Sequence, residues 1–442
     1  MQVLKKIKQG IVRFLNCKVE YDKAIKLLCL SPKYKKSLLK KIEDYENALN
    51  KINDKPKEEM IKIIFICQVP ALWNGLRTIY KYAQNARNVE AYIVALPEKI
   101  IGANYDMSKE EYGYNYSFDF CKKDYSNVIN GYDPHKKEFF DLRKLNPTYV
   151  FLQRPYDIYM PKAYQSCTIK DYAKICYIPY GYDLTIGDSR LCYGMDFISN
   201  VYAVFAENKY YKNVLDNIFD SLECLDSKRV FNLGYPRFDL YKNCYHIEES
   251  KYKKTVVWLP RWTTDATAEA TTFFLYKDIL IRFFKEHRDI RLICRPHPLM
   301  LRNFVSYNLM TEKDAQEFLD IFQEMPNFEY DLEGDYTYSF RKADVLISDF
   351  TSLLVEEILM QIPIIYTGEI KNFDNVSLTL SKGLYRAKSE DELIELLQRL
   401  IKGNDSLKDE RKKACEILEL NNFSSGKKII EALINDYQGI EK

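Results

Sequence analysis

The chain has 442 residues, a formal net charge of +2, a hydrophobic fraction of 47% and an aromatic fraction of 14%, which excludes a disordered protein and argues against a binder of nucleic acid. Its 11 cysteines include no CxxC pair and it has four histidines, so we expect neither a zinc site nor any other cofactor. We recognise no signal peptide and no apolar run near the ~18 residues of a membrane span, which predicts reduced, cytosolic cysteines.

The first predicted element is a basic amphipathic helix. Residues 1–42 contain twelve Lys or Arg and two acidic residues. The apolar residues of this helix recur at helical spacing: Leu4, Ile7, Ile11, Phe14 and Leu15. Such a helix binds an anionic membrane surface, although a solvated helix packed on the protein fits the pattern equally well. The pattern predicts a peripheral protein on the inner face of the cell membrane.

From Ile61 onward strands alternate with helices, as in domains built on parallel sheets. Short apolar runs predict six strands in a first block, over 63–66, 92–96, 149–152, 175–178, 202–205 and 230–233. We expect a helix over 74–86 and a Tyr-rich insertion over 104–132. A short helix is predicted from Asp133 through Leu145.

A second block of the same kind follows a charged stretch between Tyr241 and Lys254. Its predicted strands are 256–259, 291–294, 345–347 and 364–366, and its predicted helices are 273–287, 313–324, 391–402 and 408–420. The chain is thereby divided into a basic segment 1–58, a Rossmann-like domain 59–242, a second Rossmann-like domain 243–385 and C-terminal helices 386–442. We therefore predict an α/β protein whose two doubly wound domains face one another.

Polar residues follow the strands of the second block, at the edge where open α/β sheets bind ligands. Arg261 and Thr263 follow the first of these strands, and Arg295 and His297 follow the second. A further turn between the blocks, Gly234 to Asp239, carries the base Arg237 and an acid. Bases and hydroxyls gathered at several strand ends indicate a diphosphate site.

The turn after the third strand, Ser348 to Ser352, precedes a predicted helix. Helix N-termini bind anions, and Ser348, Thr351 and Ser352 would add hydroxyl donors, although these residues also suit simple capping of the helix. Glu356 lies one turn beyond Ser352, where it would bind a ribose diol or lie on a solvated face. There is no GxxxxGK[ST] or GxGxxG motif to support an ATPase or a dehydrogenase.

The same residues resemble the CDP-glycerol glycerophosphotransferase family, the teichoic-acid polymerase-like enzymes. The resemblance runs from about Tyr177 to Tyr366 and is carried by four motifs: GYPRFD at 234–239, LPRWTT at 259–264, RPHP at 295–298 and ADVLISDFTSLLVEE at 343–357. It implies a GT-B fold, two Rossmann-like domains facing across a cleft, with the donor in the C-terminal domain. It also implies phosphate contacts from His297, Thr351 and Ser352, with Arg261 nearby and Glu356 as an acid.

The resemblance implies transfer of a phosphoglycerol or related phospho-polyol unit from CDP-glycerol or a similar CDP-alcohol to a hydroxyl of a cell-surface polymer or its lipid-linked precursor, with release of CMP. One motif departs from the family. A His-Gly-Thr turn, whose His resembles the base that activates the acceptor, is here Pro179-Tyr180-Gly181-Tyr182.

A tyrosine hydroxyl ordinarily ionises only near pH ~10 and is a poor base at neutral pH. We therefore predict that the carboxylate of Asp183 acts as the base while Tyr180 positions the acceptor. The alternatives are that Tyr180 packs in the domain interface, that Asp183 forms an Asx turn, and that Asp188 serves instead.

Two other functions remain open from the sequence. A His-Pro after a strand also suits the phosphate of a CMP-sugar, which would make the protein a glycosyltransferase of capsule synthesis. The absence of the family histidine fits a nucleotide- or glycan-binding homologue that lacks catalysis. We predict that His297 contacts the donor diphosphate; the alternative is that it caps the end of its strand.

Overall fold

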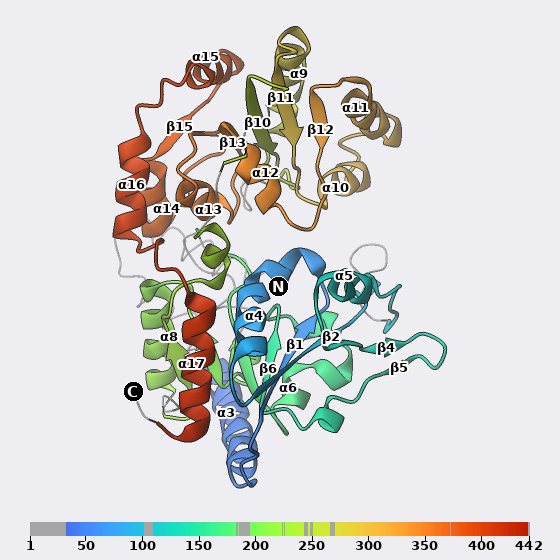
Figure 1. Cartoon of the computed structure of the whole chain (residues 1–442), viewed down its shortest axis with the longest axis vertical. Helices are drawn as coiled ribbons and strands as arrows, with labels where there is room; N and C mark the ends of the chain where they lie inside the picture. The colour runs from blue at the N-terminus through green and yellow to red at the C-terminus, as the bar shows by residue number, and fades with distance from the viewer. Residues whose placement is uncertain are drawn as a thin grey trace. The chain divides into compact units, whose positions relative to one another are not determined.

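The computed structural model describes residues 32–100, 109–182, 184, 195–222, 224, 226–242, 246–247, 251–265, 270–371 and 373–440. The chain forms two compact units, the first of residues 1–180, 187–239 and 422–442 and the second of residues 181–186 and 240–421. Each unit contains a parallel sheet covered by helices (Figure 1). The predicted basic helix with Leu4 and Phe14 and the predicted base Asp183 lie outside the described residues.

The first unit contains a seven-stranded sheet in the order β3-β2-β1-β6-β7-β8-β9, with every pair of neighbours parallel. Its strands are β1 (Ile61–Cys67), β2 (Val89–Ala95), β3 (Val128–Asn130), β6 (Tyr149–Leu152), β7 (Lys174–Tyr177), β8 (Ala203–Phe205) and β9 (Arg229–Phe231). All six strands predicted in this block are present. The chain runs outward from β1 to β3 and returns at β6, so the switch in strand order falls between β1 and β6.

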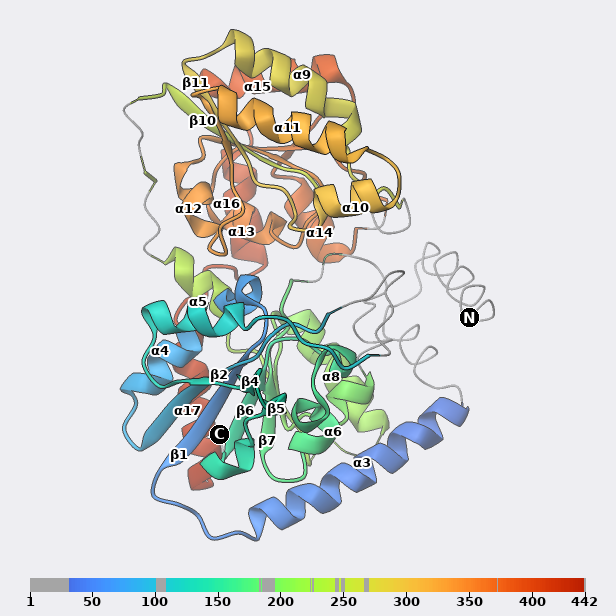
Figure 2. The same ribbon diagram turned by 90° about the vertical axis from the view of Figure 1, so that its right-hand side faces the viewer.

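Helices cover both faces of the first sheet, as the hydrophobic runs of its strands require. The helices of this unit are α3 (Pro32–Asn53), α4 (Arg77–Asn85), α5 (Tyr116–Asp124), α6 (Ser166–Ile169), α8 (Lys209–Ser221) and α17 (Ser425–Gln438). Leu38 and Ile42 of α3 join the core with α6, α8 and one face of the sheet (Figure 2). On the other face, α4 packs against α17.

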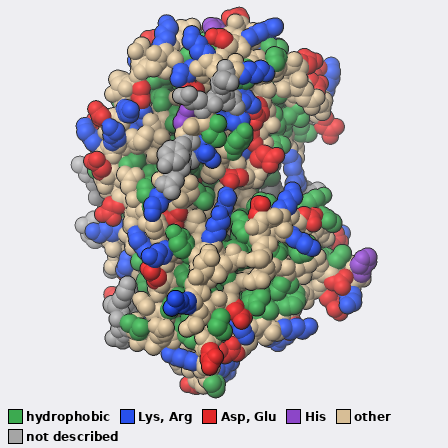
Figure 3. Space-filling model, viewed as in Figure 1, with side chains coloured by type: hydrophobic (Ala, Val, Ile, Leu, Met, Phe, Trp, Pro, Cys, Tyr) green, Lys and Arg blue, Asp and Glu red, His purple; other side chains and the backbone are tan. Residues whose placement is uncertain are grey.

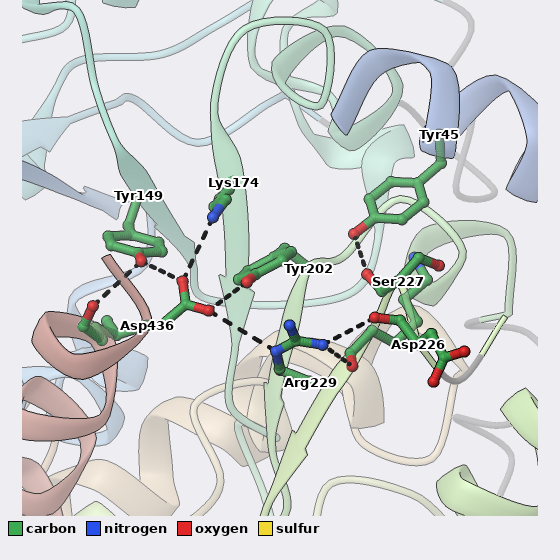
Figure 4. Close-up of polar contacts among 10 residues, drawn as sticks. Tyr45, Tyr149, Lys174, Tyr202, Asp226, Ser227, Arg229 and Asp436 are labelled. Atoms are coloured by element: carbon green, nitrogen blue, oxygen red, sulfur yellow. Dashed lines mark hydrogen bonds and ion pairs between the residues drawn. The ribbon is translucent and has the colours of Figure 1, made fainter. Parts of the chain in front are cut away.

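The C-terminal helix α17 is fastened to this unit by a polar cluster at the amino ends of four strands (Figure 4). Asp436 accepts hydrogen bonds from the hydroxyls of Tyr149, at 2.5 Å, and Tyr202. The same carboxylate pairs with Lys174 at 3.4 Å and Arg229 at 3.8 Å. The predicted segment 386–442 thus contributes helices to both units, because α17 lies in the first and the helices before it lie in the second.

The short helix predicted from Asp133 through Leu145 is wrong. This stretch forms a hairpin of β4 (Tyr132–Asp133) and β5 (Glu138–Phe139), followed by the 3₁₀ turn η3 (Leu142–Leu145). Asp133 Oδ1 accepts from the backbone N–H groups of His135 and Lys136, which makes a tight turn. Lys137 then adopts a φ of 55°, which a helix does not accommodate.

The second unit has a six-stranded sheet in the order β12-β11-β10-β13-β14-β15, again parallel throughout. Its strands are β10 (Lys254–Leu259), β11 (Ile290–Cys294), β12 (Phe328–Tyr330), β13 (Val345–Ser348), β14 (Ile364–Tyr366) and β15 (Leu384–Arg386). The four predicted strands are confirmed, whereas β12 and β15 were not predicted. The switch in strand order falls between β10 and β13.

Two layers of helices cover this second sheet as well. One layer, packed in the core with Trp258 and Ile347, contains α9 (Phe273–Glu286), α10 (Met300–Ser306), α11 (Glu312–Glu324) and α15 (Glu390–Ile401). The other helices are α12 (Thr337–Lys342), α13 (Leu354–Leu359), α14 (Asn375–Ser381) and α16 (Lys408–Ile417), of which the last three pack together. These layers leave the loops at the carboxyl ends of the strands to form a site.

Positive and negative side chains are interspersed on the face shown in Figure 3, in keeping with the net charge of +2. Within the described part of the chain, no helix combines the length and apolar character that crossing a bilayer requires. The described residues also contain no group of three or more His, Cys, Asp or Glu side chains arranged to hold a metal ion.

Candidate active site

The loops after β10, β13 and β14 converge on one buried carboxylate, Asp349. It accepts hydrogen bonds from the backbone N–H of Arg261 at 3.0 Å and from the hydroxyls of Thr271 at 2.7 Å and Thr367 at 2.8 Å. Thr272, which precedes α9, donates both its hydroxyl and its backbone N–H to the same group. Several donors on one buried carboxylate hold three loops together at the switch point of the sheet.

Arg261 is fixed by further contacts with the turn after β13. Its Nη1 donates to the carbonyl of Phe350 at 2.6 Å, and its guanidinium lies 5.0 Å from the centroid of the Phe350 ring. Thr263, predicted to bind the donor, is buried within the same loop. Its hydroxyl accepts from the N–H of Asp265 at 3.1 Å, so its observed contacts shape the loop.

His297 follows β11 in the RPHP loop, which is attached to the end of β10. Its backbone N–H donates to the carbonyl of Pro260 at 3.1 Å, and its ring centroid lies 5.9 Å from that of Trp262. The ring nitrogen Nδ1 lies 3.2 Å from the N–H of Leu299 and accepts a hydrogen bond from it. A neutral imidazole that accepts at Nδ1 carries its proton on Nε2, which makes Nε2–H a hydrogen-bond donor.

The surroundings of His297 favour this neutral form. Desolvation of the ring and the positive charge of Arg261 lower the pKa of His297 to about 4. The side chain is exposed, so water screens part of this effect. His297 therefore offers a neutral donor at pH 7.

Arg295, in the same loop, is held by an acidic neighbour. Its Nη1 lies 2.5 Å from Oδ2 of Asp331, and its Nη2 donates to the carbonyl of Glu333 at 2.5 Å. Asp331 also accepts from the hydroxyl of Ser339. These contacts fix the guanidinium of Arg295 against the segment that follows β12.

The predicted hydroxyls after β13 differ in their surroundings. Ser348 is buried, and its hydroxyl donates to Oε1 of Glu357 at 3.0 Å. Thr351 is half-buried, and its Oγ1 accepts from the N–H of Leu353 at 3.2 Å in the turn before α13, as the capping interpretation expects. A hydroxyl that accepts this bond still has a proton to donate.

Two acids of α13 lie in the interior. Oε2 of Glu356 accepts from the hydroxyls of Tyr241 and Tyr336, each at 2.6 Å, so the alternative of a solvated helix face is wrong. Burial raises the pKa of Glu357 to about 8, which keeps that carboxyl protonated at neutral pH. Both acids thus belong to the framework behind the β13 turn.

Arg237 belongs to the first unit, whereas the other predicted donor residues belong to the second. Its Nη1 donates to the carbonyl of Tyr180 at 2.8 Å, and the hydroxyl of Tyr235 donates to the carbonyl of Pro179 at 2.9 Å. Asp239 in the same motif accepts from the N–H groups of Ser425 and Gly426 at the start of α17. The GYPRFD motif therefore holds the loop after β7 and the N-terminus of α17.

Gly234 is the one glycine of this motif, and its conformation requires glycine. Its φ is +89°, in the region that side chains rarely adopt. A Cβ at this position would meet Asn422 and Ser425, so the turn also lacks room for a side chain. The absence of a side chain at Gly234 therefore lets this turn pack closely against the start of α17.

No sequence pattern assigns Asp349, Thr271 or Thr272 to this site. Asp349 lies within a recognised motif, but an Asp shortly before a helix is usually interpreted as a residue that caps the helix N-terminus. Thr271 and Thr272 precede α9, more than 70 residues before Asp349 in the chain, and no sequence pattern links them to it. Their hydrogen bonds depend on the order of the strands, which local patterns do not determine.

One family model matches the chain, and several solved structures have a similar fold. Residues 193–434, more than half of the chain, match the family model described as CDP-Glycerol:Poly(glycerophosphate) glycerophosphotransferase. No curated protein matches the chain significantly.

Among solved structures, the wall teichoic acid polymerase TagF has a TM-score of 0.52 at 14% identity, covering 95% of this chain and 97% of that one. MnaA of S. aureus, solved with UDP, has a TM-score of 0.51 at 13% identity, covering 86% and 98%. The UDP-GlcNAc 2-epimerase from Neisseria meningitidis, bound to UDP-GlcNAc, has a TM-score of 0.51 at 10% identity, covering 85% and 100%. These likenesses confirm the predicted fold class of two Rossmann-like α/β domains, as in GT-B enzymes.

Proposed function

The chain belongs to the CDP-Glycerol:Poly(glycerophosphate) glycerophosphotransferase family, and on that premise we propose which groups it transfers. The donor is CDP-glycerol or a related CDP-alcohol, and the acceptor is a hydroxyl of a cell-surface polymer or its lipid-linked precursor. The acceptor oxygen attacks the phosphorus that carries glycerol, and the bond from that phosphorus to the bridging oxygen breaks. CMP leaves with the bridging oxygen, and the hydroxyl proton passes to a base.

The observation that carries this proposal is the orientation of His297. Because Nδ1 accepts from Leu299, the Nε2–H is available to donate to a phosphate oxygen. Arg261, whose positive charge acts on the same ring, adds a cation for the charge that develops on the leaving CMP. A neutral donor beside a fixed cation suits a diphosphate.

We assign the predicted donor residues to two roles by their burial. His297 is exposed, while Arg261, Thr351 and Ser352 are half-buried, and these four contact the diphosphate. Four others hold the loops of the second unit through the contacts described above: Thr263, Arg295, Ser348 and Glu356. Arg237 instead holds the loop after β7, through the carbonyl of Tyr180.

The proton from the acceptor goes to Asp183 in this proposal, and Tyr180 positions the acceptor. The Tyr180 hydroxyl lies 3.2 Å from that of Tyr156, so two phenols are grouped after β6 and β7. Arg237 fixes the carbonyl of Tyr180. The basic N-terminal segment holds the enzyme on the inner face of the membrane, where a lipid-linked acceptor would be presented.

Release of CMP tests the proposal. The purified chain is mixed with a polymer acceptor and, in parallel, CDP-glycerol, CDP-ribitol and a CMP-sugar, and CMP is measured. We expect CMP from a CDP-alcohol. CMP from the CMP-sugar alone would establish a glycosyltransferase, and donor binding without turnover would establish the non-catalytic homologue that Tyr180 in the histidine position suggests.

A further inference from the structure

The first sheet has its own polar group at the switch in strand order, to which no role has been assigned above. Gln68 directly follows β1, and Gln153 and Arg154 directly follow β6. Since β1 and β6 are the neighbours between which the order of the sheet reverses, their carboxyl ends border the crevice where such sheets bind ligands.

Two buried amides form a framework at this point. Oε1 of Gln153 accepts from the backbone N–H groups of Gln68, at 2.7 Å, and Val69, at 2.9 Å. Nε2 of Gln68 donates to the carbonyls of Pro97 and Tyr159, at 3.2 and 2.9 Å. With its amide nitrogen so occupied, Gln68 presents its oxygen to the next side chain.

That side chain is Arg154. Its Nη2 donates to Oε1 of Gln68 at 2.9 Å, and its guanidinium lies 4.3 Å from the centroid of the Tyr159 ring. The buried Nε has no hydrogen-bond partner among the described residues. Glu98 acts on Arg154 electrostatically. Burying such a group with donors unused is costly unless a ligand completes its hydrogen bonds.

Two phenols lie beside this arginine. Tyr156 is two residues after Arg154, and its ring centroid is 6.0 Å from that of Tyr159. Its hydroxyl lies 3.2 Å from the hydroxyl of Tyr180, which comes from the loop after β7. The loops of two adjacent strands thus bring a half-buried cation and two hydroxyls to one edge of the sheet.

We propose that Arg154, with Tyr156 and Tyr180, binds a phosphodiester of the acceptor polymer. The inference rests on the proposed function and adds that the acceptor polymer is a chain of glycerophosphate units, as the family description names, whose linkages carry negative charge. A guanidinium matches two phosphate oxygens with parallel N–H groups, and a phenol donates to a third acceptor. Binding one linkage would hold the terminal hydroxyl of the chain in a fixed place.

Direct binding tests this without turnover. Calorimetry measures the affinity of a short synthetic oligo(glycerophosphate), and separately of CDP-glycerol, for the wild type, Arg154→Gln and Arg154→Lys. Arg143→Gln is the matched control, because Arg143 is an exposed arginine of the same unit paired with Asp141. We expect Arg154→Gln to weaken oligo(glycerophosphate) binding about tenfold or more, the usual worth of a charged hydrogen bond.

Arg154→Lys keeps the positive charge but loses the parallel N–H groups of the guanidinium, so its affinity for the oligomer should be intermediate. CDP-glycerol should bind all variants with equal affinity. Unchanged oligomer binding, or no binding to the wild type, overturns the inference. An equal loss for CDP-glycerol in folded protein assigns the arginine to the donor instead. Failure of the wild type to release CMP would overturn the proposed function alone, since this measurement involves no transfer.

Discussion

The two sheets share a plan but are equipped differently at the same point. In each, the first strand lies inside the sheet, two strands follow on one side and the remainder on the other. In the second unit, the charged carboxylate of Asp349 joins the loops at the switch point. In the first unit, the neutral amides of Gln68 and Gln153 join them.

This difference shows that strand order decides where a site forms and the loops decide its chemistry. Asp349 accepts hydrogen bonds from internal donors, and Arg261 and His297 border the donor position proposed above. The amides of the first unit hold Arg154 without neutralising it. We therefore assign diphosphate chemistry to the second sheet and acceptor binding to the first, and the following variants test that division.

The largest effect should come from the proposed base. Asp183→Asn removes a carboxylate while keeping nearly the same shape, and should slow transfer by ~10²-fold or more, the usual contribution of a general base. Donor affinity should not change, because the donor is assigned to the second sheet. Transfer and CDP-glycerol binding are measured separately.

Tyr180→Phe is the companion to this variant. It removes the hydroxyl that lies 3.2 Å from Tyr156 and should raise the acceptor KM several-fold with a smaller change in kcat. Near-normal transfer by Asp183→Asn would move the base to Asp188 or to the substrate. A loss of donor affinity in either variant would contradict the division between the sheets.

The next effect concerns the donor side. His297→Ala should cost at least ~2 kcal/mol of transition-state stabilisation, about thirtyfold in kcat/KM, by analogy with the loss of one oxyanion donor. His297→Gln restores a donor and should recover part of the loss.

His135→Ala is the control for this prediction, since His135 is an exposed histidine in the hairpin of the first unit. Because His297 is a neutral donor with a lowered pKa, its contribution should persist from pH 8 down to pH 6. If folded His297→Ala has a kcat/KM within a few-fold of the wild type, the role of His297 is only to cap the end of its strand.

Whether the sequence predicts a strand depends on a recognisable apolar run rather than on the length of the strand. The three-residue strands β8 and β14 are apolar throughout and were predicted, whereas β3, β12 and β15 each contain a polar residue (Asn130, Glu329 and Arg386) and were not. The site residues of the second sheet stand in contiguous motifs. Arg154 and Gln68 lie in no such motif. They are 86 residues apart, and their contact depends on β1 and β6 being neighbours in the sheet.

A smaller effect should distinguish the units by pH. In the second unit, burial raises the pKa of Glu357 from 4.5 to about 8, so the folded state keeps a proton that the unfolded state loses, and stability falls as pH rises from about 4.5 to 8. In the first unit, burial lowers the pKa of Lys228 from 10.5 to about 7, so stability rises with pH between these values.

Glu357→Gln should stabilise the second unit progressively more as pH rises from about 4.5 to 8, and should have little effect at pH 4.5. Amide exchange of β13 reports on this unit, and exchange of β7 reports on the first. Glu395→Gln, on the exposed face of α15, should leave both profiles unchanged. Parallel pH profiles for the two units in the wild type would show that these buried groups do not govern stability.

The smallest effect concerns the basic segment attached to the first unit. The structure determines where to cut, because Leu38 and Ile42 of α3 belong to the core, and removing residues 1–42 would damage the fold. Deleting residues 1–31 removes seven of the twelve basic residues and spares α3.

Each basic residue near an acidic lipid surface contributes at most ~1 kcal/mol, so the deletion should weaken binding to anionic vesicles in a salt-dependent way and leave binding to neutral vesicles unchanged. Lys36→Gln with Lys40→Gln on exposed positions of α3 tests whether the rest of the segment contributes. Co-sedimentation at low and high salt measures both variants, with CMP release from CDP-glycerol as the check of the intact enzyme. Equal sedimentation of the full-length and shortened chains, or binding indifferent to salt, would place any membrane contact elsewhere and leave the division of donor and acceptor between the two sheets unaffected.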